Sequence, residues 1–270
     1  MRVSTRHAVF LALAMLAHWH GAHAGEPLRL RVLSYNIRHG EGMDGKVDLE
    51  RIAKVIGSVK PDLVALQEVD QKTRRTGEVD QPAELARLTG MHPVFGGNIP
   101  FQGGRYGNAL LSRLPVKRSE NHPLPTFYQG EQRGVMEAEI EASGGHPPIL
   151  FFVTHLDYRG NSRERPASAE RINGLVAKAS DRPAVVTGDL NDRIGSETLK
   201  GFETTWSRVN AAEQPTFPSD KPNRQIDFIL FRPQSRWKVI EARVLEEPMA
   251  SDHRPYFAVL ELNTGSETPR

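Results

Sequence analysis

The chain has 270 residues, with 35 Lys and Arg residues, 33 Asp and Glu residues and no cysteine. This length fits one large α/β domain or two small ones, and the apolar fraction of 38% predicts a packed core. Disulfide bonds and thiolate metal sites are excluded because cysteine is absent, so any metal must be held by oxygen or imidazole ligands.

The first residues have the pattern of an export signal. Arg2 and Arg6 precede a short apolar run over residues 9–17, and small residues follow at Ala22 and Ala24. This order of a positive region, an apolar region and small residues is typical of a cleaved signal peptide. The apolar run is too short to span a membrane as a helix. We therefore expect cleavage after residue 24, with a retained anchor as the alternative.

Cleavage would change the charge of the chain. Residues 1–24 hold two basic and no acidic residues, so the mature domain over residues 25–270 has 33 basic and 33 acidic residues. A dedicated nucleic-acid binder usually carries a strong basic excess, which this domain lacks. The balance argues mildly against a processive nuclease. We expect a monomeric protein in the periplasm or the medium, without stable membrane insertion.

Hydrophobic periodicity predicts a single domain in which strands alternate with helices. Helical spacing is present over three segments, and Asp48 is expected to cap the first of them. Residues 96–104 are rich in glycine and are expected to form a loop. No internal repeat or dividing linker is present. The expected helices are 48–59, 82–89 and 162–179, and the expected strands are 28–37, 63–66, 108–111, 133–140, 149–154, 184–188, 225–231 and 256–262.

Several of these strands end in a polar residue of metal-binding or acid–base type. Asn36, Glu68, His155 and Asp189 each follow an apolar run. In layered α/β domains, functional sites gather outside strand ends, so these side chains are expected to share one cleft. Asp189 and Asn191 are two residues apart and can point the same way, offering a carboxylate and an amide to a metal or a phosphate. The alternative for this pair is an ordinary Asx turn.

Seven short motifs occur in the order found in the endonuclease/exonuclease/phosphatase superfamily, and the chain resembles that group from Leu28 to Leu262. The group includes deoxyribonucleases, neutral sphingomyelinases and inositol-polyphosphate 5-phosphatases. The resemblance implies a four-layer α/β/β/α sandwich of two mostly antiparallel sheets. It also implies hydrolysis of a phosphate ester with a divalent metal, usually Mg²⁺, or Mn²⁺. The motifs are Tyr35–Ile37, Leu66–Val69, Tyr106–Arg113, Thr154–Leu156, Gly188–Asn191, Ile226–Ile229 and Ser251–Pro255.

The resemblance assigns the metal and the attacking water to particular residues. Glu68 would be the main metal carboxylate, with Asn36 and Asp252 near it. Asp189 would orient or deprotonate the water, and Asn191 would hold a phosphate oxygen. Magnesium keeps several waters and needs few carboxylates, so this small set of oxygen ligands is sufficient.

The resemblance also implies two histidines at the phosphate. His253 would stabilise the developing negative charge, Asp227 would hold its imidazole, and His155 would be a second imidazole on the phosphate. Hydrolysis adds negative charge to an anionic centre, which a hard cation and imidazolium donors can neutralise. A histidine paired with a buried carboxylate keeps its proton near neutral pH.

Two further residues are candidates for substrate binding. Arg133 could meet a phosphate bidentately, and Asn108 could donate to one, with a surface salt bridge and a turn amide as the alternatives. Arg38 and His39 follow Asn36 where some nuclease branches carry an extra acid. That departure argues against a second strong metal site.

The preferred function is an exported, metal-dependent phosphodiester hydrolase, with a slight preference for a small or lipid-derived substrate. An extracellular deoxyribonuclease is the alternative. A non-catalytic binding protein on the same scaffold is the alternative of another class. It predicts loss of Glu68, Asp189, Asn191 or His253, and all four residues are present.

Overall fold

The computed structural model describes residues 27–160, 163–179 and 181–263, so the expected signal segment over residues 1–24 lies outside the described residues. The described chain forms two six-stranded sheets and four α-helices. No helix in this described part is long and apolar enough to cross a membrane.

The first sheet contains one parallel pair of strands, β1 and β2, and its other neighbours are antiparallel. The parallel pair lies at the centre of the sheet, so the carboxyl ends of these two strands lie at the same edge. In spatial order the strands are β11 (Trp237–Val244), β12 (Tyr256–Leu262), β1 (Leu28–Asn36), β2 (Leu63–Gln71), β4 (Gly104–Ser112) and β3 (His92–Phe101).

The second sheet repeats this plan, with β7 and β8 as its one parallel pair. Contacts between β1 and β8 and between β2 and β7 pack the two central pairs face to face. The spatial order is β5 (Val116–Pro123), β6 (Gly134–Ile140), β7 (Ile149–His155), β8 (Ala184–Asp189), β10 (Asp227–Arg232) and β9 (Ser207–Arg208).

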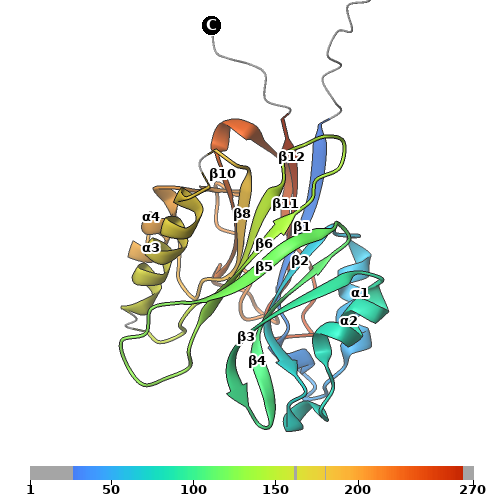
Figure 1. Cartoon of the computed structure of the whole chain (residues 1–270). Coiled ribbons are helices and arrows are strands. Elements are labelled where there is room, and N and C mark those ends of the chain that lie inside the picture. The colour runs from blue at the N-terminus through green and yellow to red at the C-terminus, as the bar shows by residue number, and fades with distance from the viewer. Residues whose placement is uncertain (1–26, 161–162, 180, 264–270) are drawn as a thin grey trace, which may run out of the picture.

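Helices cover the outer face of each sheet, which confirms the expected four-layer α/β/β/α sandwich (Figure 1). One apolar cluster fills the space between the sheets, and two others lie under the helix pairs. Helices α1 (Leu49–Ser58) and α2 (Gln81–Thr89) cover the first sheet. Helices α3 (Glu164–Ala177) and α4 (Glu197–Glu203) cover the second. Three short 3₁₀ turns connect other elements: η1 (Arg38–Gly40), η2 (Arg74–Thr76) and η3 (Gln234–Arg236).

The central strands are apolar almost throughout because both of their faces are buried. On β1, Leu30 and Val32 face the space between the sheets, whereas Leu33 and Tyr35 face the helices. Helix α1 begins where expected, since the side chain of Asp48 accepts a hydrogen bond from the amide of Arg51. The local patterns therefore predicted both the central strands and this helix start.

The expected loop over residues 96–104 is wrong, because β3 and β4 form a hairpin through this segment. Its glycines allow a close backbone approach: a Cβ on Gly107 would lie 2.0 Å from the carbonyl oxygen of Gly96. Strands β5 and β11 were not expected from the sequence. They are edge strands with many exposed residues, so they lack the apolar alternation of a buried strand.

Candidate active site

Four predicted residues lie at the carboxyl ends of the two parallel strand pairs. Asn36 ends β1 and Glu68 lies in β2, while His155 and Asp189 are paired in register at the ends of β7 and β8. Asp227 opens the antiparallel strand β10 directly opposite Asp189. A cleft of about 480 Å³ lies at this edge of the sandwich. Its lining includes Glu68, Arg133, His155, Asp189, Asn191 and His253.

The carboxylate of Asp189 lies at the centre of the cluster and is almost completely buried. Its Oδ2 accepts a hydrogen bond of 3.2 Å from the amide nitrogen of Asn36. The same oxygen lies 3.5 Å from Nε2 of His155 and 3.7 Å from Nε2 of His253. Its Oδ1 accepts from the backbone N–H of Asn191 at 2.9 Å. Residues from both sheets therefore converge on one carboxylate.

Burial raises the pKa of Asp189 to about 7, and the nearby charge of Asp227 acts in the same direction. His253 opposes this shift. A carboxylate with a pKa near neutrality can accept a proton from water more readily than an ordinary aspartate. The position and the pKa of Asp189 both suit the predicted role of orienting or deprotonating a water.

Glu68 reaches the cleft from an irregular point in β2. The register with β4 shifts between Leu66 and Val69, and Glu68 between them has a φ of 58°. A bulge of this kind redirects a side chain, and the left-handed conformation costs about 1–3 kcal/mol for a residue other than glycine. The Glu68 carboxylate accepts a hydrogen bond of 3.0 Å from the amide nitrogen of Asn36. The amide of Asn36 thus bridges two carboxylates.

The carboxylate oxygens at this edge of the cleft suit a hard divalent cation. Glu68 is half-buried at the cleft, and its carboxylate offers oxygens of the type that Mg²⁺ and Mn²⁺ prefer. Asp252, the third predicted ligand, lies beside Arg38 at 4.0 Å, and its side chain is about a third exposed. Ser251 ties this segment to the first sheet, because its hydroxyl donates to the carbonyl oxygen of Asn36 at 2.7 Å.

His253 is held by a chain of hydrogen bonds. Its Nδ1 lies 2.9 Å from Oδ2 of Asp227, and the hydroxyl of Thr216 donates to the same oxygen at 2.5 Å. Burial alone would lower the pKa of His253, but the carboxylates of Asp227 and Asp189 outweigh it and raise that pKa to about 10. His253 is therefore an imidazolium at neutral pH.

Asp189, Asp227 and His253 also lie close enough together to suggest a metal site by spacing alone. The hydrogen bond between Nδ1 of His253 and Oδ2 of Asp227 already occupies one possible ligand atom of each of these two residues. A cation there would also face an imidazolium. The group is better explained as an acid–base cluster, and Glu68 remains the predicted metal carboxylate.

The remaining predicted residues are placed as follows. Asn191 lines the cleft with a φ of 50°, and its amide nitrogen donates to the carbonyl oxygen of Leu156 at 3.1 Å. Asn108 is buried, and its amide nitrogen donates to the carbonyl oxygen of Gly134 at 3.1 Å. Asn108 is thus held within the fold next to the strand that follows Arg133.

Four cleft residues were not identified from the sequence: Glu131, Tyr158, Phe217 and Arg224. Glu131 forms an ion pair of 2.9 Å with Arg133, and burial raises the pKa of Glu131. The ring of Phe217 lies 4.8 Å from the ring of His253, and Tyr158 is an exposed aromatic residue at the rim. These residues lie in loops outside the seven motifs, so no local pattern marked them.

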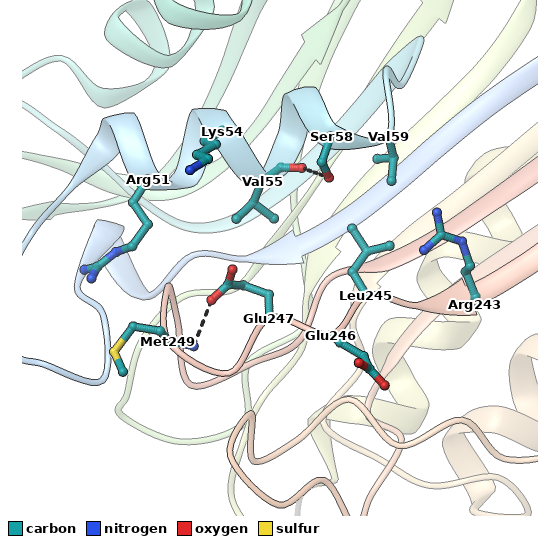
Figure 2. Close-up of a pocket in the computed structure, with 10 residues that line it drawn as sticks. All are labelled: Arg51, Lys54, Val55, Ser58, Val59, Arg243, Leu245, Glu246, Glu247 and Met249. Atoms are coloured by element: carbon teal, nitrogen blue, oxygen red, sulfur yellow. Dashed lines mark hydrogen bonds between the residues drawn. The ribbon is translucent and has the colours of Figure 1, made fainter.

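A second hollow of about 530 Å³ lies between α1 and the chain after β11 (Figure 2). Here Glu247 points back to its own loop, and its Oε1 accepts from the backbone N–H groups of Met249 and Ala250 at 2.9 and 3.0 Å. These bonds order the turn that leads into Asp252 and His253. The hollow therefore lies next to the turn that positions Asp252 and His253.

Comparison with known proteins gives consistent results. A model of the Endonuclease/Exonuclease/phosphatase family matches residues 33–253. The uncharacterized protein YbhP of Escherichia coli K12 is 26% identical over 247 residues, covering 86% of this chain and 96% of that protein. A 5'-tyrosyl-DNA phosphodiesterase of Caenorhabditis elegans is 24% identical over 200 residues, covering 70% of this chain and 51% of that protein.

A solved structure gives the same result for the fold. The crystal structure of an endonuclease/exonuclease/phosphatase from Beutenbergia cavernae superimposes with a TM-score of 0.74 and 26% identity, covering 87% of this chain and 72% of that chain. The family match spans most of the chain, from the second half of β1 through β2, β7 and β8 to His253. The chain belongs to the endonuclease/exonuclease/phosphatase family.

Proposed function

We propose that this protein is a divalent-metal-dependent phosphodiester hydrolase. The observation that carries the proposal is the convergence of Asn36, Glu68, His155 and His253 around the buried carboxylate of Asp189. The cluster combines a metal carboxylate, a group able to accept a proton and two imidazoles in one cleft. A non-catalytic binding protein would not need this combination.

The residues divide the chemistry between them. Glu68, with Asn36 and Asp252 near it, would hold the metal, which would polarise the phosphate when bound. Asp189 orients a water for in-line attack and accepts its proton. His253, held as an imidazolium by Asp227, donates to the phosphate oxygen as negative charge develops. His155 reaches the same carboxylate from β7 in the second sheet, whereas His253 precedes β12 in the first.

The proposed substrate is a small or lipid-derived phosphodiester. The balanced charge of residues 25–270 supports this choice, since a nuclease that tracks along DNA usually carries a basic excess. Export by cleavage after residue 24 is part of the proposal. An extracellular deoxyribonuclease is the second candidate, supported by the 24% identity to a tyrosyl-DNA phosphodiesterase.

The first test is hydrolysis of bis-p-nitrophenyl phosphate by the mature chain with Mg²⁺ or Mn²⁺. Glu68→Gln and His253→Gln should each lower kcat at least about 100-fold, and Glu120→Gln and His92→Gln on exposed strands serve as matched controls. Mg²⁺ should raise the Tm of the wild type but not of Glu68→Gln, because a bound cation stabilises the folded state. Unchanged rates in both cleft variants would overturn the proposal.

The substrate class needs a separate experiment. A panel of sphingomyelin, phosphatidylinositol, inositol phosphates, RNA and plasmid DNA would be compared at one metal concentration. We expect the highest kcat/KM on a small or lipid-derived diester. A higher kcat/KM on DNA than on every other substrate would favour the nuclease.

A further inference from the structure

Arg133 reaches the active site behind His155. Both residues are buried, with 5% and 4% of their surfaces exposed. Nη1 of Arg133 lies 3.0 Å from Nδ1 of His155 and 2.9 Å from the carboxylate of Glu131. A terminal guanidinium nitrogen carries two hydrogens, so it can face both groups.

The chemistry of the guanidinium fixes the direction of the contact with His155. Arginine remains protonated in proteins and has no acceptor atom. Arg133 must therefore be the donor, and Nδ1 of His155 must present its lone pair. A neutral imidazole with a free Nδ1 carries its proton on Nε2.

We propose that Arg133 is a positioning residue that holds His155 as the neutral tautomer with its proton on Nε2. The Nε2–H then points to the cleft, where Oδ2 of Asp189 lies 3.5 Å away. His155 becomes an uncharged hydrogen-bond donor, whereas His253 is a charged one. The two imidazoles of the cleft thus differ in protonation because one meets an arginine and the other an aspartate.

The surroundings of His155 agree with this assignment. The charged and titratable groups that face its ring are Arg133 just before β6, Asp189 on β8 and His253 before β12. Burial lowers the pKa of His155 well below its usual value, and the charges of Arg133 and His253 add to that effect. The ring is therefore neutral across the neutral pH range.

The assignment changes the predicted role of Arg133. Its Nη1 is engaged by two protein groups, whereas its Nε has no hydrogen-bond partner in the described part of the chain. Under the proposed function, loss of Arg133 should act on the turnover step through His155 and leave substrate affinity nearly unchanged. Kinetics can separate the two roles.

The direct test is NMR of the ¹⁵N-labelled mature chain, using long-range ¹H–¹⁵N correlation of the histidine rings at neutral pH. His155, assigned by loss of its signals in His155→Gln, should show a protonated Nε2 and an unprotonated Nδ1. A proton on Nδ1, or on both nitrogens, would overturn the proposal. This measurement needs no substrate, so it tests the tautomer of His155 independently of the phosphodiesterase activity.

Variants provide the second arm. In Arg133→Met the Nε2–H tautomer should lose its preference, and kcat on bis-p-nitrophenyl phosphate should fall about 10- to 100-fold with KM changed less than about threefold. Arg133→Lys, which keeps a charged donor, should recover part of kcat and the tautomer. Arg29→Met, at an exposed ion pair with Glu261, is the matched control. A higher KM with unchanged kcat in Arg133→Met would show a substrate-binding arginine instead.

Discussion

At the scale of single residues, the site depends on which partner each imidazole meets. His253 contacts the carboxylate of Asp227, whose other partner is Thr216. His155 contacts a guanidinium instead. Burial lowers the pKa of both imidazoles. The negative charge of Asp227 outweighs burial and raises the pKa of His253, whereas the positive charge of Arg133 adds to burial and lowers that of His155 further.

The raised pKa of His253 predicts how stability depends on pH. The folded state holds this proton up to about pH 10, against a usual value of 6.5, so it contributes stability below pH 6.5 that is lost as pH rises through 10. A tenfold difference in proton affinity between the folded and unfolded states corresponds to about 1.4 kcal/mol. Unfolding free energies of the metal-free protein, measured by urea titration in EDTA, should fall over this window in the wild type.

Asp227→Asn should flatten that dependence because it removes the carboxylate that raises the pKa of His253. Asp220→Asn, at an exposed position, is the matched control and should keep the wild-type slope. Equal slopes in the wild type and Asp227→Asn would contradict the assignment of this pair.

Gln67 is an unusual residue next to the site. It is fully buried and lies beside Asn36 in register, and neither its amide nitrogen nor its oxygen has a hydrogen-bond partner within the described part of the chain. An unpaired buried amide costs about 1–3 kcal/mol, so an apolar residue of similar shape should be tolerated. We expect Gln67→Met to leave Tm unchanged or higher in a calorimetric scan. A loss of stability of more than about 2 kcal/mol would show that the amide has a stabilising partner.

At the scale of elements, the parallel pair in each sheet brings the predicted site residues together. The carboxyl ends of β1 and β2 carry Asn36 and Glu68, and those of β7 and β8 carry His155 and Asp189. Antiparallel neighbours begin at the same edge, which is why Asp227 lies opposite Asp189. A short stretch of β8 therefore determines where the central carboxylate lies.

Gly188 in that stretch tolerates no side chain. Its φ is 151°, and a Cβ would lie 1.8 Å from the carbonyl oxygen of Thr154 on β7. We expect Gly188→Ala to destabilise the protein by more than about 2 kcal/mol and to lower activity by displacing Asp189. Urea unfolding would measure the first effect. Gly174→Ala, where a Cβ meets no neighbouring atom within 4 Å, is the control, and equal losses in both would refute this explanation.

At the scale of the whole molecule, two sheets of matching plan enclose one apolar core and share one cleft. Asn36 and Asp189 are hydrogen-bonded across this interface although 153 positions separate them in the chain. The site therefore depends on the packing of both halves. Separation of the two sheets should therefore abolish activity even while each sheet keeps its secondary structure.

Export is a prediction about the whole chain. We propose that expression of the full sequence in a bacterium with a signal peptidase yields a mature protein that begins at Gly25 in the periplasm. Mass spectrometry of the periplasmic fraction would measure the N-terminus, and light scattering should give the mass of a monomer. An intact N-terminus at Met1 in the membrane fraction would support a retained anchor instead.

The sequence by itself determined the residue types of the site and the strands that carry them. The buried strands were predictable because both of their faces are apolar. The polar residues that end these apolar runs are equally recognisable: Asn36, Glu68, His155 and Asp189. The order of motifs then indicated the family and the four-layer fold. Edge strands such as β5 were not predicted, because their exposed residues show no alternation of apolar and polar side chains.

Only the tertiary structure decided which of these residues meet and in what state. Local periodicity contains no information on strand order, so the contacts of Asp189 with Asn36, His155 and His253 could not be derived from it. The contact of Arg133 with His155 could not be derived from local periodicity either. Arg133 precedes β6 and His155 ends β7, and only the antiparallel pairing of these strands brings the two residues together. Protonation follows from such neighbours through charge and burial, and these exist only in the folded chain.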